Sequence, residues 1–181
     1  MKIIVIGAGA MGCLYGAYLS KHNNVTMLDV YEPQVESINQ NGITVLEEDG
    51  TEQHFSNIRA MKSGTCKEVA DLVIVFVKST HTESSLEENK ELFGENTLVM
   101  TLQNGAGNDR KIAKYVKTEN IIIGTSKHNS VNLGGGKIRH SGNGVTTIGS
   151  NLEENVHLQT VADLLSEAGF QSAVSDDIQR I

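Results

Sequence analysis

The sequence is poor in the residues from which metal sites and disulfide frameworks are built. Its 181 residues include two cysteines, one proline and no tryptophan. Cys13 and Cys66 show no metal-ligand or redox spacing, so we expect two buried or partly buried thiols. The six histidines include no H-x-x-x-H pair, which argues against a bound metal.

Long apolar runs and an excess of basic charge are also missing. No run approaches the roughly 18 apolar residues of a membrane helix, and the chain begins without a basic-then-apolar leader, so no membrane span is expected. The 15 Lys and Arg residues are outnumbered by 22 Asp and Glu, for a net charge of −7, which argues against a nucleic-acid partner. We therefore expect a metal-free cytoplasmic protein that binds neither nucleic acid nor membrane.

The start of the chain carries its strongest functional signal. A short β-branched run, Ile3–Ile6, leads directly into the pattern G-x-G-x-x-G. The loop residues, all expected to contact a dinucleotide, are Gly7, Ala8, Gly9, Ala10, Met11 and Gly12. The glycines permit a tight turn, a close approach of the backbone to a pyrophosphate and close packing of the next helix. The phosphates would lie at that helix N-terminus. The alternative is a glycine-rich turn in an ordinary α/β unit.

Strand and helix patterns alternate along most of the chain. Strands are expected at 3–6, 25–29, 72–77, 97–102, 120–124 and 171–174, and helices at 13–19, 32–40, 79–93, 109–116 and 154–168. This alternation predicts an α/β fold with a Rossmann-type, doubly wound, mostly parallel sheet and crossover helices. Leu72–Val77 is the clearest central strand, because its six apolar residues do not alternate with polar ones.

Two stretches depart from this alternation. Residues 43–60 predict a hairpin, with strands at 43–46 and 54–59 around a turn at 48–50. Residues 125–150 carry two glycine-rich turns between short polar-alternating runs, which predicts antiparallel hairpins rather than another crossover. We therefore expect the sheet to carry an antiparallel hairpin extension.

Asp29 is expected at the carboxyl end of the second strand. An acid at this place normally accepts hydrogen bonds from the adenosine ribose hydroxyls and repels a 2′-phosphate, which favours NAD over NADP. No Lys or Arg occurs in residues 30–34 to bind a 2′-phosphate. The alternative is a solvated turn aspartate that contacts no ligand.

Lys78 and Asn104 lie just past the carboxyl ends of two consecutive predicted strands. Ligands of open α/β sheets bind in the crevice at that edge. Lys78 is therefore a candidate to hydrogen-bond the nicotinamide end of the cofactor, and Asn104 to orient it. Each also has an ordinary interpretation, as a solvated lysine and as part of an Asn-Gly turn.

Four motifs in order make the chain resemble the ketopantoate reductase (2-dehydropantoate 2-reductase) family along essentially its whole length. They are the Gly7–Gly12 loop, Val77-Lys78, Gln103-Asn104-Gly105 and the segment from Gly124 to Gly149. The resemblance implies a reductase that transfers hydride from a nicotinamide to a branched 2-keto acid, as in the step from ketopantoate to pantoate in pantothenate biosynthesis. It also implies that Lys78 and Asn104 contact the cofactor and help to organise the active site.

The chain departs from the family pattern at the cofactor. The family norm is NADP, held by a basic residue near the end of the second strand, whereas this chain has Asp29 there. Relatives with an acid at this place resemble NAD-dependent D-2-hydroxyacid dehydrogenases, which is the alternative function. The family often has Gln three residues after the lysine, where this chain has His81.

The resemblance further implies a second, all-helical domain that supplies a general-acid lysine and a substrate-binding glutamate. Residues 1–175 are then the dinucleotide-binding domain, and residues 176–181, with Asp176 and Asp177 as a helix N-cap, start a helix leading to that absent domain. The lysine, expected after Ile181, would stabilise and protonate the alkoxide left by hydride addition. We expect this chain alone to bind nucleotide without turnover, and a homodimer through the second domain.

Two further interpretations stay open. A non-catalytic NAD(P)-sensing module has the same glycine loop and needs no second domain. A generic Rossmann domain with degenerate function would bind neither nucleotide. Sister families that begin with G-x-G-x-M-G, such as 3-hydroxyacid and 6-phosphogluconate dehydrogenases, differ after the Rossmann core, where the segment from Gly124 to Gly149 favours ketopantoate reductase.

Overall fold

A computed structural model describes residues 1–103 and 107–178 of the chain. In this part, eight strands form one sheet in the order β12-β11-β8-β7-β6-β1-β2-β5. They are β1 (Lys2–Ile6), β2 (Asn24–Asp29), β5 (Arg59–Lys62), β6 (Leu72–Val75), β7 (Leu98–Thr101), β8 (Ile121–Ser126), β11 (Val145–Gly149) and β12 (Gln171–Val174). Every neighbouring pair is parallel except β8 with β11. The predicted mostly parallel α/β sheet is confirmed.

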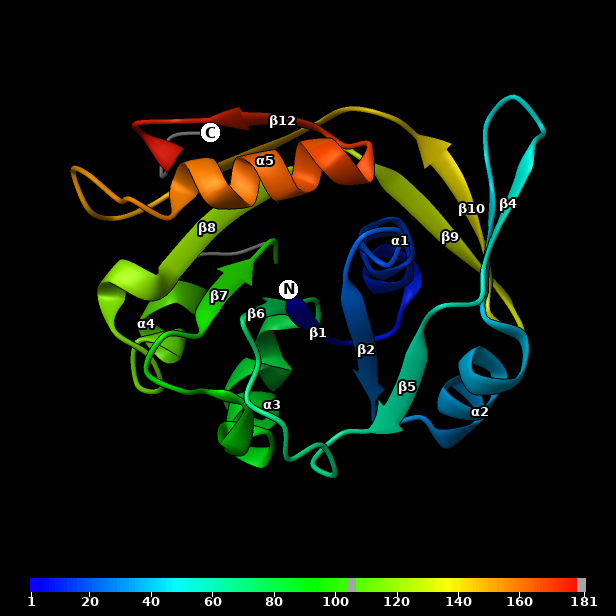
Figure 1. The fold of residues 1–181 in the computed structure, drawn as a ribbon, viewed down its shortest axis with the longest axis horizontal. Coiled ribbons are helices and arrows are strands. Elements are labelled where there is room, and N and C mark those ends of the chain that lie inside the picture. Colours follow the sequence, from blue (N-terminus) through cyan, green and yellow to red (C-terminus); the bar gives the residue numbers. More distant parts are fainter. Residues whose placement is uncertain (104–106, 179–181) are drawn as a thin grey trace.

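Helices cover both faces of this sheet (Figure 1). One face carries α1 (Ala10–Leu19), α2 (Glu32–Asn41) and α5 (Leu158–Ala168), and the other carries α3 (Thr82–Glu88) and α4 (Asn108–Ile112). Short 3-10 helices span Ser79–His81, Lys90–Leu92 and Thr118–Asn120. Side chains of a strand point alternately to the two faces. Ile3 and Val5 of β1 therefore join one hydrophobic core, and Ile4 and Ile6 join the other.

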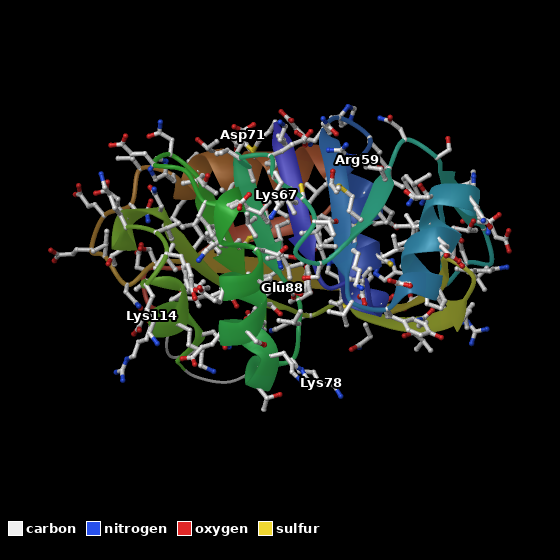
Figure 2. The ribbon with its side chains drawn as sticks, turned by 90° about the horizontal axis from the view of Figure 1, so that it is seen from below. Arg59, Lys67, Asp71, Lys78, Glu88 and Lys114 are labelled. Carbon is white, nitrogen blue, oxygen red and sulfur yellow. The ribbon has the colours of Figure 1, made fainter. Side chains whose placement is uncertain are left out.

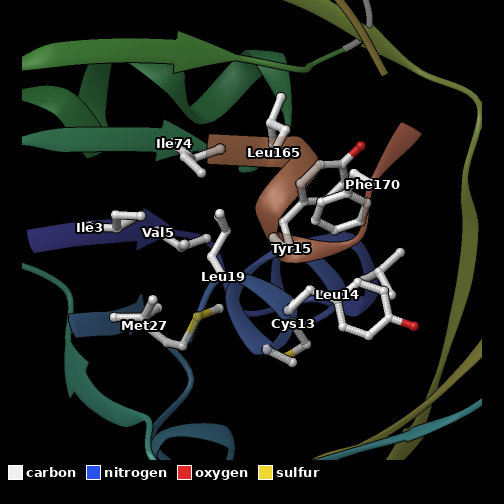
Figure 3. Close-up of a cluster of buried hydrophobic side chains, with 14 of the residues drawn as sticks. Ile3, Val5, Cys13, Leu14, Tyr15, Leu19, Met27, Ile74, Leu165 and Phe170 are labelled. Carbon is white, nitrogen blue, oxygen red and sulfur yellow. The ribbon is translucent and has the colours of Figure 1, made fainter. Parts of the chain in front are cut away.

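The larger core surrounds α1, whose residues from Gly12 to Leu19 are all buried. Such a helix has neighbours on every side. Figure 3 shows Tyr15 of α1 against Phe170, with Leu165 of α5 nearby, and the two aromatic rings are stacked with centroids 4.3 Å apart. Helix α1 thus lies between the main sheet, α5 and a second, smaller sheet.

That smaller sheet has the strand order β4-β3-β10-β9 within the described residues. Its strands are β3 (Ile43–Leu46), β4 (Glu52–Phe55), β9 (Asn129–Gly134) and β10 (Lys137–Gly142). Two antiparallel hairpins, β3–β4 and β9–β10, join through parallel pairing of β3 with β10. The hairpins agree with the predicted antiparallel extension. Their union into one sheet was not predicted, because parallel pairing of distant segments leaves no local pattern.

The predicted return strand of the first hairpin exists, but its bounds of 54–59 are wrong. Strand β4 ends at Phe55, and Arg59 instead begins β5, which pairs in parallel with β2 at the edge of the main sheet. The clearest central strand, predicted to reach Val77, ends at Val75.

Three predicted helices are shorter than expected. The helix at 154–168 begins only at Leu158, because the Asn155 side chain accepts a hydrogen bond from the His157 N–H (2.9 Å) and holds a non-helical turn. The helix at 109–116 is reduced to α4, followed by turns. The helix at 79–93 is broken into two 3-10 turns flanking α3. Asn89 ends α3, and its amide donates to Ser63 Oγ.

Candidate functional site: the glycine loop and the carboxyl edge of the sheet

The glycine loop joins β1 to α1 at the carboxyl edge of the main sheet. Gly7 has a φ of +104°, and a Cβ there would come within 3.0 Å of the Phe76 carbonyl carbon. A Cβ on Gly12 would lie only 1.9 Å from the Gly7 carbonyl oxygen, whereas one on Gly9 would meet nothing within 4 Å. The first and third glycines are thus required by packing, and the middle one faces open space.

The N-terminus of α1 follows directly from this loop. Gly9 is its N-cap, and no side chain caps the helix. The first N–H groups of a helix have no partner within the helix, and together with the helix dipole they attract an anion. Backbone donors at Ala10 and Met11 therefore lie beside the open space above Gly9.

A pocket of about 390 Å³ opens beside the loop, a size typical of small-molecule sites. Its walls come from the glycine loop, the end of β2, α2 and the turn between β9 and β10. The lining residues are Ala8, Gly9, Asp29, Tyr31, Pro33, Gln34, Ser37, Asn132, Gly134 and Gly135. They include no Lys or Arg, so this wall offers no side-chain cation to a phosphate.

Asp29 lies at the end of β2, as predicted, and its carboxylate faces the loop. Oδ2 accepts a hydrogen bond from the Ala8 N–H (2.7 Å), and Oδ1 accepts one from the Tyr31 N–H (2.9 Å). Each carboxylate oxygen has a second lone pair. Asp29 can therefore hold the loop and still accept a hydroxyl group from the pocket side.

Gln34 of α2 was missed by the sequence reasoning. It is buried, and its Nε2 donates to the Ala8 carbonyl oxygen at 2.8 Å. The Cys13 thiol also donates to that oxygen at 3.4 Å. Burial raises the pKa of Cys13 to about 12, so the thiol keeps its proton, and Cys66 is buried too. A polar residue one turn before Ile38, on the buried face of α2, was the only signal of this contact.

Lys78 follows β6 at the same edge of the sheet. Figure 2 shows Lys78 on the opposite side of the molecule from Asp71, which precedes β6. Its side chain is exposed, and its carbonyl oxygen accepts a bond from the N–H of His81, which is also exposed (2.8 Å). Asn104, the other residue predicted at this edge, lies outside the described residues.

Gln103 ties the turn that carries Lys78 to the next strand. Its Nε2 donates to the Val77 carbonyl oxygen and to Thr82 Oγ1 (2.8 Å), and its Oε1 accepts from Thr101 Oγ1 (3.0 Å). The Gly7–Gly12 loop, Asp29 and Lys78 thus share one edge of the sheet, and partly buried hydrogen bonds of Asp29 and Gln103 hold the backbone there.

A second polar cluster, which we call the histidine junction, lies where the small sheet meets α1. It consists of Tyr18, Glu47, His128 and His140, which also line a pocket of about 380 Å³. His140 Nδ1 lies 2.8 Å from Glu47 Oε2, and His140 Nε2 lies 2.9 Å from His128 Nδ1. The Tyr18 hydroxyl donates to Glu47 Oε1. The sequence reasoning did not bring these residues together.

The carboxylate of Glu47 helps to decide which ring nitrogens of the two histidines in the junction carry protons. If the His140 ring is neutral and donates through Nδ1 to Glu47, its Nε2 accepts, so His128 donates through Nδ1. Burial, and secondarily the neighbouring His140, lower the pKa of His128. The neutral ring then keeps a lone pair on Nε2, which is buried and has no partner among the described residues.

Neither a metal site nor a membrane helix is seen in the part of the chain that the structure describes. Within residues 1–103 and 107–178, no group of three or more His, Cys, Asp or Glu side chains is arranged to hold a metal ion. Over the same ranges, no helix has the length and apolar character to cross a bilayer.

Comparison with known proteins identifies a family and several relatives. The family described as "Ketopantoate reductase PanE/ApbA" matches residues 3–153. A 2-dehydropantoate 2-reductase of Streptococcus pyogenes serotype M3 is 31% identical over 180 residues, which are 98% of this chain and 58% of the relative. A 2-dehydropantoate 2-reductase of Lactococcus lactis is 33% identical, with the same two coverages. The chain thus spans somewhat more than half the length of these relatives.

Solved structures agree on the fold. A D-mandelate dehydrogenase with NADH and anilino(oxo)acetate superimposes with a TM-score of 0.91 at 30% identity, over 99% of this chain and 58% of that one. A 2-dehydropantoate 2-reductase from Enterococcus faecalis, described as putative, gives a TM-score of 0.92 at 27% identity, with the same coverages.

Proposed function

This chain belongs to the ketopantoate reductase PanE/ApbA family, and we propose that it is the nicotinamide-dinucleotide-binding part of a 2-keto acid reductase. The observation that carries the proposal is the glycine loop, with Gly9 facing open space at an uncapped helix N-terminus. A pyrophosphate needs this combination of close backbone approach and unpaired N–H donors. The residues present therefore fit the cofactor.

The proposal gives each predicted site residue a role. Gly7, Ala8, Gly9, Ala10, Met11 and Gly12 form the pyrophosphate cradle. Asp29 accepts the adenosine ribose hydroxyls, while Lys78 and Asn104 serve the nicotinamide end of the site. The bound nicotinamide supplies the hydride. Proton delivery to the resulting alkoxide belongs to a lysine outside these 181 residues, in the part of the relatives that this chain does not span.

For the substrate, we propose a branched 2-keto acid, with ketopantoate reduced to pantoate. Support comes from the 2-dehydropantoate 2-reductases that are 31% to 33% identical to this chain. Ketopantoate carries an anionic carboxylate beside its keto group, and an ammonium group on the enzyme side can stabilise the charge that develops during reduction. A homodimer of the full-length protein through its second domain is part of the same proposal.

For the cofactor, we propose NAD rather than the NADP usual in the family. Asp29 supports this choice, because its carboxylate borders a pocket whose lining contains no Lys or Arg. A 2′-phosphate placed there would face a negative charge without a compensating cation. The same observation favours a second candidate function, an NAD-dependent D-2-hydroxyacid dehydrogenase, which fits the similarity to the NADH-bound D-mandelate dehydrogenase.

Calorimetric titration of the chain with NADH and NADPH tests the binding proposal. We expect NADH to bind more tightly, and Asp29→Ala and Asp29→Arg to weaken that preference by about tenfold, which corresponds to about 1.4 kcal/mol. Asp163→Ala, an exposed change on α5, is the matched control and should leave both affinities unchanged. Failure to bind either nucleotide overturns the proposal, and tighter binding of NADPH by the unaltered chain overturns the choice of NAD.

The substrate is tested with the full-length protein, using ketopantoate and bulkier 2-keto acids such as benzoylformate with both cofactors. The highest kcat/KM on ketopantoate supports the first candidate. Preference for benzoylformate with NADH supports the second. Nucleotide binding with no turnover of any 2-keto acid supports a sensing module and contradicts both reductase candidates.

A further inference from the structure

The peptide groups on both sides of Ala8 are held by side chains from two different elements. Asp29 of β2 accepts the Ala8 N–H at 2.7 Å, and Gln34 of α2 donates to the Ala8 carbonyl oxygen at 2.8 Å. Ala8 is itself buried, whereas Gly9 is exposed. The loop is therefore fixed immediately before the residue at which a pyrophosphate would approach.

Fixing the Ala8 carbonyl also fixes the direction of the next donor. In a trans peptide the C=O and N–H bonds point in opposite directions, and the described residues contain no cis peptide. Because the Ala8 carbonyl points toward buried Gln34, the Gly9 N–H points away from α2. Apart from Gly9 and its two chain neighbours, no atom lies within 4 Å of where a Gly9 Cβ would be. The Gly9 N–H thus belongs to a residue that a ligand can approach closely.

Gln34 is an unusual residue for its position. Within α2 the buried side chains are Gln34 and Ile38, which lie one turn apart on the same face. An aliphatic residue would be the ordinary choice there, because burying an amide is unfavourable unless its hydrogen bonds are made. Gln34 is only 8% exposed and uses its amide on Ala8 and, at 3.6 Å, on the Cys13 sulfur. The side-chain amide of Gln34 therefore bonds the glycine loop and the start of α1.

We propose that Gln34 is a positioning residue for the dinucleotide: it holds the Ala8–Gly9 peptide so that the Gly9 N–H meets the pyrophosphate. The inference rests on the proposed function, because it presumes that the loop binds a dinucleotide. With Gln34 in this role, two side chains hold the loop: Asp29 bonds the Ala8 N–H, and Gln34 bonds the Ala8 carbonyl oxygen. Asp29 alone would leave the Ala8 carbonyl with the weak thiol donor of Cys13.

Replacing the amide without changing the length of the side chain tests this role. Gln34→Met keeps an unbranched chain and removes the N–H donor, while Gln34→His keeps a ring N–H at a similar reach. We expect Gln34→Met to raise the Kd for ADP-ribose about tenfold, which corresponds to about 1.4 kcal/mol, and Gln34→His to restore most of the loss. Gln40→Met, an exposed change on the same helix, is the control and should bind as the unaltered chain does.

The amide resonance of Gly9 separates positioning from a purely structural effect. In the unaltered chain at saturating ADP-ribose, the Gly9 amide proton should shift downfield because it donates to a phosphate oxygen. In Gln34→Met at saturation we expect a smaller shift. An unchanged Gly9 shift, a Kd within about twofold of the unaltered chain, or an equal loss in Gln40→Met overturns the inference. If the unaltered chain does not bind ADP-ribose, the proposed function itself fails.

Discussion

The two halves of helix α1 use polar groups in opposite ways. Its N-terminus follows the run Gly7-Ala8-Gly9-Ala10, Gly9 is exposed, and the helix has no side-chain cap. In its second half Tyr15 and Tyr18 are buried among aromatic rings, and their hydroxyls are bonded to protein groups. The first half leaves its backbone N–H groups free for the proposed dinucleotide, whereas the second half uses its side-chain hydroxyls in contacts within the fold. The proposed binding end and a docking end thus occupy one helix of ten residues.

Side chains of the docking end, the second half of α1, bond both the smaller sheet and the main sheet. Tyr18 donates to Glu47, which lies just after β3, and Glu47 bonds His140 of β10. Tyr15 bonds Ser126 and Thr146 on β8 and β11 of the main sheet, and burial raises the pKa of its hydroxyl. The contrast teaches that the same helix anchors two sheets with side chains while its backbone serves the site.

The largest effects are expected from replacing two glycines of the loop by alanine, one required by packing and one facing open space. In Gly12→Ala the new Cβ would lie 1.9 Å from the Gly7 carbonyl oxygen, so we expect a loss of about 3 kcal/mol or more in the free energy of unfolding. In Gly9→Ala the Cβ meets nothing within 4 Å, so stability should change by less than about 1 kcal/mol. Nucleotide affinity should fall in both. Urea denaturation and calorimetric titration measure the two effects.

An equal loss of stability in the two glycine variants would contradict the distinction between packing and binding roles in the loop. So would a Gly9→Ala variant with undiminished affinity for NADH.

Removing the His140 ring from the histidine junction should lower the stability of the fold and leave nucleotide affinity nearly unchanged. His140→Ala leaves the buried His128 Nδ1 without its partner and removes one of the contacts of the Glu47 carboxylate, which keeps Tyr18 and Gln53. This loss should cost about 2 to 3 kcal/mol of unfolding free energy. The affinity for NADH should stay within about twofold, because the glycine loop keeps all its contacts. Urea denaturation and titration check both halves of the prediction.

His54→Ala in β4 is the matched control, since this histidine is exposed and bonds only the Thr44 hydroxyl among the interactions described. It should change stability by less than about 0.5 kcal/mol. If His140→Ala weakens NADH binding as much as it weakens the fold, the two ends of α1 are coupled rather than separate.

A change of pH is the mildest perturbation, because it adds a proton and removes no atom. The pKa of His128 is lowered in the folded protein, first by burial and then by His140, so the unfolded chain takes up the proton more readily. The contribution of His128 to stability is therefore complete above its ordinary pKa of 6.5 and declines as the pH falls through that value. The unfolding free energy of His128→Gln should fall less steeply between pH 7.5 and 5.5. Parallel slopes for the two proteins would refute this assignment.

Much of the main sheet was predictable because its elements are marked by patterns of neighbouring residues in the sequence. The glycine loop, Asp29 and the strand beginning at Leu72 each have a pattern that needs only neighbouring residues, and all three lie where they were expected. The helix expected at 32–40 is confirmed too, since α2 runs from Glu32 to Asn41. Strand β5 and the start of α5 were misjudged, because distant pairing and the Asn155 side chain decide them.

By itself, the sequence determined the α/β class and the glycine loop, because glycine spacing and runs of buried strand residues act over short distances along the chain. The four motifs in order were enough to place the chain in its family. Only the tertiary structure decided that β3 pairs with β10, that Glu47, His140 and His128 form one junction, and that Gln34 reaches Ala8. These contacts join residues far apart in sequence. Their strength depends on burial, which removes competing water and exists only once the layers have packed.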